Sequence, residues 1–164
     1  MIEKWDAYDE NFTRVANVEL IRGEHIHQGL FHLVCDVIVK HQDGTYLLMR
    51  RDLKKKHGGM WEASAGGSAL KGEEPLDCAK RELWEETGIV AENITEIGRE
   101  IRADCASIYV EFLCVVDGDK HSIRFQEGET IDYRWVTLEE FQKMSPEELL
   151  TTRIQKFMPE FCKK

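Results

Sequence analysis

Three glutamates, Glu82, Glu85 and Glu86, are spaced so that an α-helix would bring their carboxylates together on one face. Like-charged pairs at this spacing cost about 0.2–0.5 kcal/mol each, and the negative C-terminal end of a helix disfavours carboxylates further. Arg81, four residues before Glu85, offsets only part of this cost. A local conflict of this kind indicates a functional site. Because Mg²⁺ and Mn²⁺ prefer oxygen ligands, the cluster predicts a site for a divalent cation.

The residues around the cluster predict the helix that would carry it. Pro75 suits the first turn, because the N–H groups there have no partner within the helix and proline lacks an N–H. Gly88 suits the left-handed position just past the end of the helix. We therefore expect a helix over residues 74–87. An apolar stripe would pack this helix against a sheet. The stripe consists of Leu76, Ala79 and Leu83.

Residues 67–89 also follow a longer pattern: Gly, five residues, Glu, seven residues, Arg-Glu-Leu, one residue, Glu-Glu, one residue and Gly-Ile. This stretch resembles the Nudix box, the signature of a family of metal-dependent hydrolases of nucleoside diphosphates linked to another group. A bare E-x-x-E-E run is more often a solvated acidic face, but the complete box favours the functional interpretation. The resemblance covers residues 66–89 tightly and residues 29–160 loosely.

The resemblance implies a set of metal ligands. Glu82, Glu85 and Glu86 would bind Mg²⁺ or Mn²⁺, and a backbone carbonyl, that of Gly66, would be a further ligand. The family also uses a glutamate from a later loop as a metal ligand or base. Our candidate is Glu129, because it lies just before the last predicted strand.

The resemblance also implies catalytic roles. Arg81 would orient the glutamates, and a water aligned by a carboxylate would attack phosphorus and split the P–O–P linkage. The general base stays open among Glu82, Glu129 and the second candidate from the later loop, Glu127.

A basic loop over residues 50–59 precedes the box in an otherwise acidic chain. Arg51 and Lys55 are the candidates for holding substrate phosphates there, because arginine can grip a phosphate through two hydrogen bonds and lysine acts as a point charge. The alternative is a solvated charged loop. Paired glycines, Gly66 and Gly67, would let the backbone approach a ligand closely.

Composition limits the classes of partner. The net charge of −9 argues against long nucleic acid, whose binding depends on neutralising phosphates, and is compatible with a small phosphorylated substrate that metal ions receive. No apolar run is long enough to span a membrane, and the N-terminus lacks an apolar signal core. The 5 cysteines show no CxxC spacing and indicate reduced thiols. We therefore expect a cytoplasmic protein.

The order of elements predicts an α+β fold. Strands are expected at residues 31–39, 45–49, 94–102, 107–116 and 131–136, and a short hairpin within residues 1–28. Thr137 and Glu140 predict a capping box, and Ser145 with Pro146 predicts a second, longer C-terminal helix. We expect one domain over residues 1–164, with residues 1–28 as an N-terminal extension and residues 29–164 as the core. The resemblance implies an α/β/α sandwich, in which the box helix and a C-terminal helix pack on a mixed sheet.

Two rival functions stay open. The N-terminal segment, residues 30–32 and the basic loop also resemble the isopentenyl-diphosphate isomerases of the same superfamily. Those enzymes need a cysteine in the segment after Trp61, and residues 61–67 contain none. The second rival is a non-catalytic nucleotide-sensing module, whose metal helix is usually eroded.

Substrate identity is less well defined. The resemblance implies a pyrophosphohydrolase acting on a nucleoside di- or triphosphate derivative. The proline that ADP-ribose hydrolases carry about sixteen residues after the box is absent from residues 103–106. A homodimer is common in the family.

Overall fold

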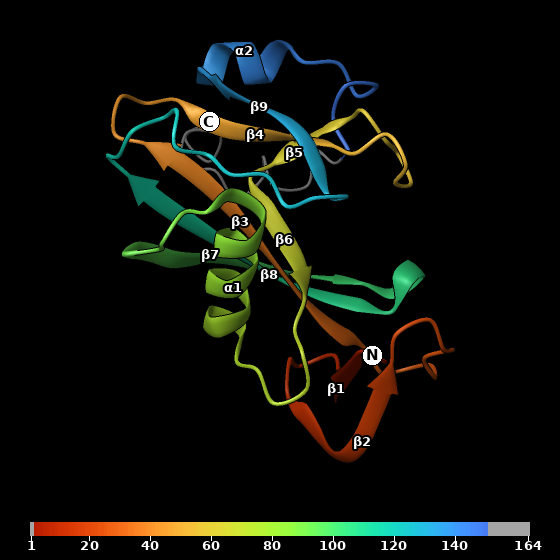
Figure 1. Cartoon of the computed structure of the whole chain (residues 1–164). Coiled ribbons are helices and arrows are strands. Elements are labelled where there is room, and N and C mark those ends of the chain that lie inside the picture. Colours follow the sequence, from red (N-terminus) through yellow and green to blue (C-terminus); the bar gives the residue numbers. More distant parts are fainter. Residues whose placement is uncertain (1, 151–164) are drawn as a thin grey trace.

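A seven-stranded mixed sheet forms the centre of the protein; the computed structural model describes residues 2–150 (Figure 1). Its strands are β3 (His32–His41), β4 (Tyr46–Arg51), β5 (Trp61–Ala63), β6 (Ala65–Ser68), β7 (Asn93–Arg102), β8 (Ser107–Val116) and β9 (Thr130–Val136). Strand β3 is central and runs parallel to β8, whereas its pairings with β4 and β6 are antiparallel. All five strands expected in residues 29–164 are present, which confirms the mixed sheet.

The sheet opens between β3 and β4. These two strands pair only at Lys40 and Tyr46, after which β6 becomes the partner of β3, and β5 and β9 pair with β4. Ser64, between β5 and β6, bridges the gap: its hydroxyl accepts from the Val39 N–H at 2.7 Å and donates to the Leu47 carbonyl at 3.0 Å. The chain therefore crosses from one part of the sheet to the other at this serine.

The two α-helices of the described residues cover opposite faces of the sheet. They are α1 (Pro75–Thr87) and α2 (Leu138–Lys143). Val37 and Val39 of β3 pack in one core with α1, whereas Ile38 packs in a second core with Phe141 of α2. Alternate side chains of a strand point to opposite faces, so this division gives the expected α/β/α layering.

The box helix begins and ends where the sequence predicts. Pro75 occupies its first turn, and Gly88 follows in the left-handed region with φ 74° and donates to the Trp84 carbonyl at 2.8 Å. The predicted apolar stripe is wrong at Leu76, which is 40% exposed, while Cys78 is fully buried. The buried face is rotated toward Cys78 and the glutamates, so Leu76 lies at its border.

The N-terminal segment forms the expected hairpin, from β1 (Lys4–Tyr8) and β2 (Arg14–Ile21), as a separate two-stranded sheet. Tyr8 and Phe31 exchange two backbone hydrogen bonds of 2.9 Å, and the Trp5 ring stacks on His32 at a centroid distance of 4.4 Å. These contacts join the hairpin to the beginning of β3.

The C-terminal part differs from expectation. Thr137 and Glu140 form the predicted capping box on α2. A helix does not begin at Pro146, because the following residues form turns and Leu149 pairs with Trp61 in a parallel bridge. The remainder of that predicted helix lies outside the described residues.

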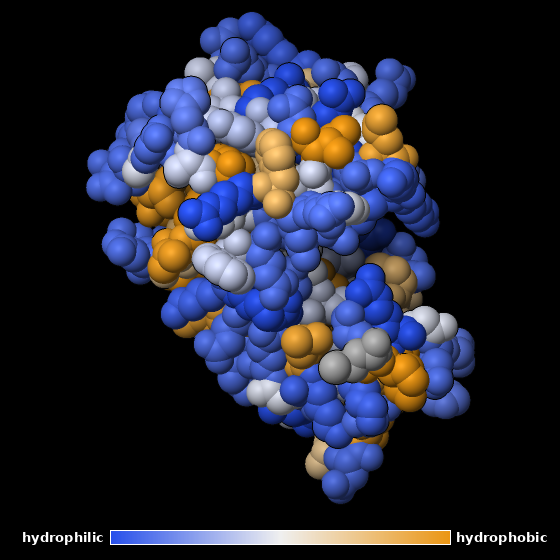
Figure 2. Space-filling view, viewed as in Figure 1, coloured by the Kyte–Doolittle hydropathy of each residue, from blue (hydrophilic) through white to orange (hydrophobic). Residues whose placement is uncertain are grey.

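The surface in Figure 2 is mostly hydrophilic, with hydrophobic residues in small separate groups. Among the described helices, none has the length and apolar character needed to cross a membrane.

Candidate active site

A cavity of about 350 Å³ contains the residues that the sequence singled out. Its lining consists of Glu3, Arg22, Arg51, Lys55, Gly66, Gly67, Ser68, Leu70, Arg81, Glu82, Glu85, Glu86, Gln126 and Glu129. The hairpin, the basic loop, β6, α1 and the loop before β9 all contribute. Of the two later-loop candidates, Glu129 is part of the lining and Glu127 is not.

The glutamates of α1 are crowded on the side that faces β6. Oε2 of Glu86 accepts a hydrogen bond from the Gly66 N–H at 3.1 Å. Burial, together with the nearby carboxylates of Glu62 and Glu82, raises the pKa of Glu86 to about 8. Burial also raises the pKa of Glu82, although Arg81 opposes this. A partly buried group of carboxylates with too little positive charge around it is the donor set that a divalent cation would neutralise.

Arg81 joins three of the acidic side chains. Its Nε and Nη2 donate to the two oxygens of Glu73 at 2.8 and 2.9 Å, and its Nη1 donates to Glu82 at 2.7 Å and Glu85 at 3.2 Å. Nη2 also donates to the Ser68 carbonyl at 3.2 Å. Through these contacts Arg81 holds the side chains of Glu73, Glu82 and Glu85 close together.

The same contacts shape the carboxylate cluster. Within residues 2–150, no group of three or more acidic, histidine or cysteine side chains already has the arrangement of a metal cage. Arg81 holds Glu82 and Glu85 toward itself, and Glu86 bonds to the Gly66 amide. The residue types and their proximity fit an oxygen-ligand metal site.

At Gly66 and Gly67, where the box begins, the backbone lies so close to carboxylate side chains that only glycine fits. A Cβ on Gly67 would lie 2.3 Å from Oε1 of Glu82, and one on Gly66 would lie 2.1 Å from Oδ1 of Asp36. Both distances are well inside van der Waals contact. Glycine at these positions therefore leaves room for a carboxylate beside the backbone.

The basic loop faces the carboxylates across the cavity. Lys55 forms an ion pair with Glu129, and burial followed by the charge of Arg51 lowers the pKa of Lys55. Arg51 is held by Glu62 through two hydrogen bonds of 3.0 and 2.8 Å, and its Nε donates to the Lys56 carbonyl. Arg51 thus reaches the cavity with most of its donors already engaged.

Several lining residues were not predicted. Glu3 and Arg22 come from the hairpin, and Ser68, Leu70 and Gln126 come from segments without a recognisable motif. Long-range packing brings them to the cavity, so no local sequence signal could have identified them.

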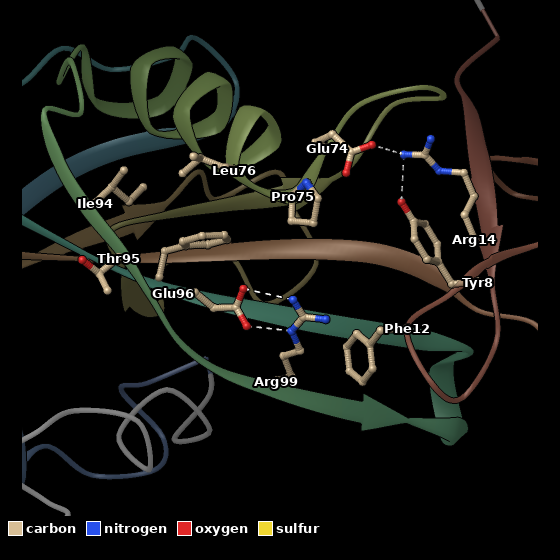
Figure 3. A pocket seen from close by; sticks show the side chains of 11 residues that line it. Tyr8, Phe12, Arg14, Glu74, Pro75, Leu76, Ile94, Thr95, Glu96 and Arg99 are labelled. Carbon is tan, nitrogen blue, oxygen red and sulfur yellow. Dashed lines mark hydrogen bonds and ion pairs between the residues drawn. The ribbon is translucent and has the colours of Figure 1, made fainter.

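A hollow larger than the catalytic cavity lies elsewhere on the described surface. It has a volume of about 780 Å³ and lies between the hairpin, the first turn of α1 and β7 (Figure 3). Its charges are paired internally: Arg99 bonds to Glu96 at 2.6 and 3.1 Å, and Arg14 bonds to Glu74 at 2.9 Å. It contains none of the clustered α1 glutamates, so size alone does not identify the catalytic site.

The fold and this site define a phosphoanhydride hydrolase of the Nudix type, and the comparisons with known proteins agree. Residues 30–161 match the family model described as the NUDIX domain, and the chain therefore belongs to this family. An uncharacterized Nudix hydrolase from Listeria monocytogenes is 32% identical over 146 residues, which cover 87% of this chain and 85% of the relative. The uncharacterized Nudix hydrolase YfcD from Escherichia coli is 32% identical over 83% of this chain and 71% of its own length. The protein is accordingly a hydrolase of acid anhydrides in phosphorus-containing substrates.

Solved structures confirm the fold. A Deinococcus radiodurans protein superposes with a TM-score of 0.77 at 16% identity, covering 99% of this chain and 100% of that one. A MutT protein from Methanosarcina mazei gives a TM-score of 0.62 at 26% identity, over 80% of this chain and 93% of its own. The NUDIX domain of NrtR from Shewanella oneidensis, solved with ADP-ribose, gives 0.62 at 19% identity, over 77% of this chain and 84% of that one.

Proposed function

We propose that the protein is a metal-dependent pyrophosphohydrolase that cleaves the P–O–P linkage of a nucleoside di- or triphosphate derivative. The observation that carries this proposal is the meeting of the three α1 glutamates with Lys55 in one cavity. Phosphoryl transfer depends mainly on positioning and charge neutralisation, and a cavity with an acidic wall and a basic wall suits both.

The acidic wall would hold the metal. Glu82, Glu85 and Glu86 would be ligands, joined by the carbonyl of Gly66 and by Glu129. Mg²⁺ or Mn²⁺ would supply charge neutralisation of the diphosphate and a lowered pKa for a coordinated water.

The chain's own residues would position the reactants. Lys55 would exchange its ion pair with Glu129 for substrate phosphate, which releases a carboxylate next to the reacting phosphorus. Arg51, braced by Glu62, would add positive charge to the same wall. The water-activating base would be Glu82 or Glu129, since Glu127 lies outside the lining.

A neighbouring hollow supports a substrate larger than a bare diphosphate. It measures about 480 Å³, shares Arg51 and Gly66 with the catalytic cavity, and is also lined by Asp36 and Tyr109. This space would receive the group attached to the diphosphate, with an aromatic ring and a carboxylate at hand for a base or a sugar. The ADP-ribose in the Shewanella neighbour is a ligand of this general kind.

The setting of the enzyme follows from the same features. We expect one domain acting in the cytoplasm on a small molecule, with the described cysteines Cys35, Cys78, Cys105 and Cys114 as free thiols. Size-exclusion chromatography with light scattering would decide whether the chain forms the homodimer common in the family.

A hydrolysis screen tests the activity. Purified protein with Mg²⁺ or Mn²⁺ would be mixed with nucleoside triphosphates, nucleotide sugars, ADP-ribose, dinucleoside polyphosphates and isopentenyl diphosphate. We expect release of phosphate or nucleoside monophosphate from a nucleotide, no isomerisation, and loss of turnover by Glu86→Gln in a folded protein. Metal-independent turnover, or full activity of Glu86→Gln, would contradict the proposal. Isomerisation of isopentenyl diphosphate would support the isomerase alternative, and binding without turnover would support the sensing module.

A further inference from the structure

The N-terminal hairpin contributes an ion pair to the catalytic cavity. Glu3 lies just before β1 and Arg22 just after β2, and both line the cavity together with Glu82 and Glu129. The Arg22 N–H donates to the Glu3 carbonyl at 3.0 Å, and Nη1 of Arg22 donates to Oε2 of Glu3 at 2.7 Å. The open end of the hairpin, where its two strands separate, is therefore the part that reaches the site.

A chain of contacts fixes this end of the hairpin. Oε1 of Glu3 accepts from the Trp5 indole N–H at 2.6 Å. Trp5 is 7% exposed, and its ring is stacked on His32 at the beginning of β3. The Lys71 N–H, in the loop before α1, donates to the Lys4 carbonyl at 2.9 Å. The buried Trp5 thus fixes the Glu3 carboxylate, and Glu3 in turn fixes the Arg22 side chain.

Arg22 differs from the other cations of the cavity in how little it is engaged. Arg81 bonds to three carboxylates, Arg51 to Glu62, and Lys55 to Glu129. In the described part of the chain, the Arg22 side chain makes one hydrogen bond, to Glu3, and it is 67% exposed. Its remaining N–H donors are available to a ligand, and a guanidinium matches the geometry of phosphate oxygens.

We propose that Arg22 is a substrate-binding residue that grips the phosphate oxygens facing away from the α1 glutamates, and that Glu3 is the residue that positions it. This inference rests on the proposed diphosphate chemistry of the same cavity. It gives the hairpin a function: the hairpin adds a cation to those of the basic loop, and the donors of this cation are less engaged with carboxylates.

Binding of inorganic pyrophosphate with Mg²⁺, measured by calorimetry, tests the contact directly, alongside KM and kcat for the substrate that the screen identifies. Arg22→Gln should weaken pyrophosphate binding about tenfold and raise KM by a similar factor, with a smaller change in kcat. Arg22→Lys should recover part of the loss. Lys4→Gln is the matched control: it removes one positive charge from the same hairpin, outside the cavity lining, and should leave both quantities unchanged.

The positioning role of Glu3 has its own test. Glu3→Ala should raise KM, and it should add little in the Arg22→Gln background, because both changes disable one contact. Additive effects of the two changes would reject the positioning role.

The proposal is overturned if the wild-type protein does not bind pyrophosphate, or if Arg22→Gln and Arg22→Lys both keep affinity and KM within twofold of wild type. If Arg22→Gln does not fold, Arg22→Lys with Glu3→Ala decides the question. These outcomes can be distinguished from failure of the proposed activity, which Glu86→Gln tests. If Glu86→Gln loses turnover while Arg22→Gln keeps wild-type KM and pyrophosphate affinity, only the role of the hairpin is rejected.

Discussion

The Gly66 amide donates a hydrogen bond of 3.1 Å to Oε2 of Glu86, so the backbone of β6 and the last turn of α1 meet directly at the catalytic cavity. Gly67, the next residue, leaves room for the Glu82 carboxylate. The two glycines and the two glutamates form one unit, in which the shape of the backbone decides where the carboxylates lie.

Gly67→Ala tests this unit. The new methyl group would displace the Glu82 carboxylate, because it would lie 2.3 Å from Oε1. We expect kcat to fall about 10- to 100-fold, since small displacements of a catalytic group have effects of this size. Thermal unfolding should change little, because the displaced atoms end a flexible side chain. Gly118→Ala, where a Cβ meets nothing within 4 Å, is the control for the kinetic and thermal measurements. Wild-type kcat in Gly67→Ala would contradict the claim that the glycine backbone positions the Glu82 carboxylate.

The metal-free protein should lose stability as the pH rises toward 8.5. In the folded state Glu86 keeps its proton up to a pKa of about 8, whereas its ordinary value is 4.5. The folded state therefore binds more protons than the unfolded state between these values, and stability falls as the pH rises through this window. Between pH 6.5 and 8.5, with EDTA, we expect a loss of about 1–2 kcal/mol, measured as a lower Tm.

Two comparisons isolate the cause of that pH effect. Glu86→Gln has no carboxyl group at position 86, so its Tm should change less with pH over the same range. The pKa of His32 is lowered from 6.5 by burial, so its contribution lies mainly below this window. Mg²⁺ at pH 8.5 should restore the Tm of the wild-type protein, because a ligand of the folded state stabilises it. Equal slopes for wild type and Glu86→Gln would reject the assignment.

Arg81→Lys should separate charge from geometry. Lysine keeps the positive charge but loses the planar fork that bonds Glu73, Glu82 and Glu85 together. We expect kcat to fall about 10- to 100-fold, as for other residues that orient metal ligands, and the free energy of unfolding to fall by about 1–3 kcal/mol. Steady-state kinetics and urea unfolding measure the two effects. Wild-type kcat in Arg81→Lys would show that charge alone suffices.

Ser64→Ala should destabilise the fold without changing catalysis. It would remove the hydroxyl to which the buried Val39 N–H donates, at a cost of about 1–3 kcal/mol, while the Leu47 carbonyl keeps its hydrogen bond from the backbone N–H of residue 64. Metal affinity and kcat per folded molecule should stay near wild type. Ser122→Ala removes an exposed hydroxyl that bonds to the Asp119 carbonyl, and should have a much smaller effect on Tm. Equal Tm shifts for Ser64→Ala and Ser122→Ala would show that the buried hydroxyl of Ser64 stabilises the fold no more than an exposed hydroxyl does.

Local signals explain which parts of the molecule could be predicted. Pro75 and Gly88 determine where α1 begins and ends, and the capping box of Thr137 and Glu140 determines the start of α2. Strand β8 matches its predicted range because β-branched and aromatic residues predominate in it. These features depend on neighbours in the sequence.

The features that could not be predicted depend on distant residues. The helix expected after Ser145 fails at its start because Leu149 pairs with Trp61, more than eighty residues earlier. Leu76 matched the periodic pattern, but the sheet and the glutamates decide which face of α1 is buried. Arg22 was missed because only the packing of the hairpin against β3 brings it to the cavity.

The parallel pairing of β3 with β8 has a consequence for how the enzyme acquires activity. It runs from His32 opposite Ser107 to His41 opposite Val116, so the chain must close a long loop before this ladder can form. Box helix, basic loop and glycines all lie inside that loop. Pairing between strands so distant in sequence is slow. During refolding, helical signal should therefore appear before catalytic activity, and recovery of turnover should report the late closure of the central sheet.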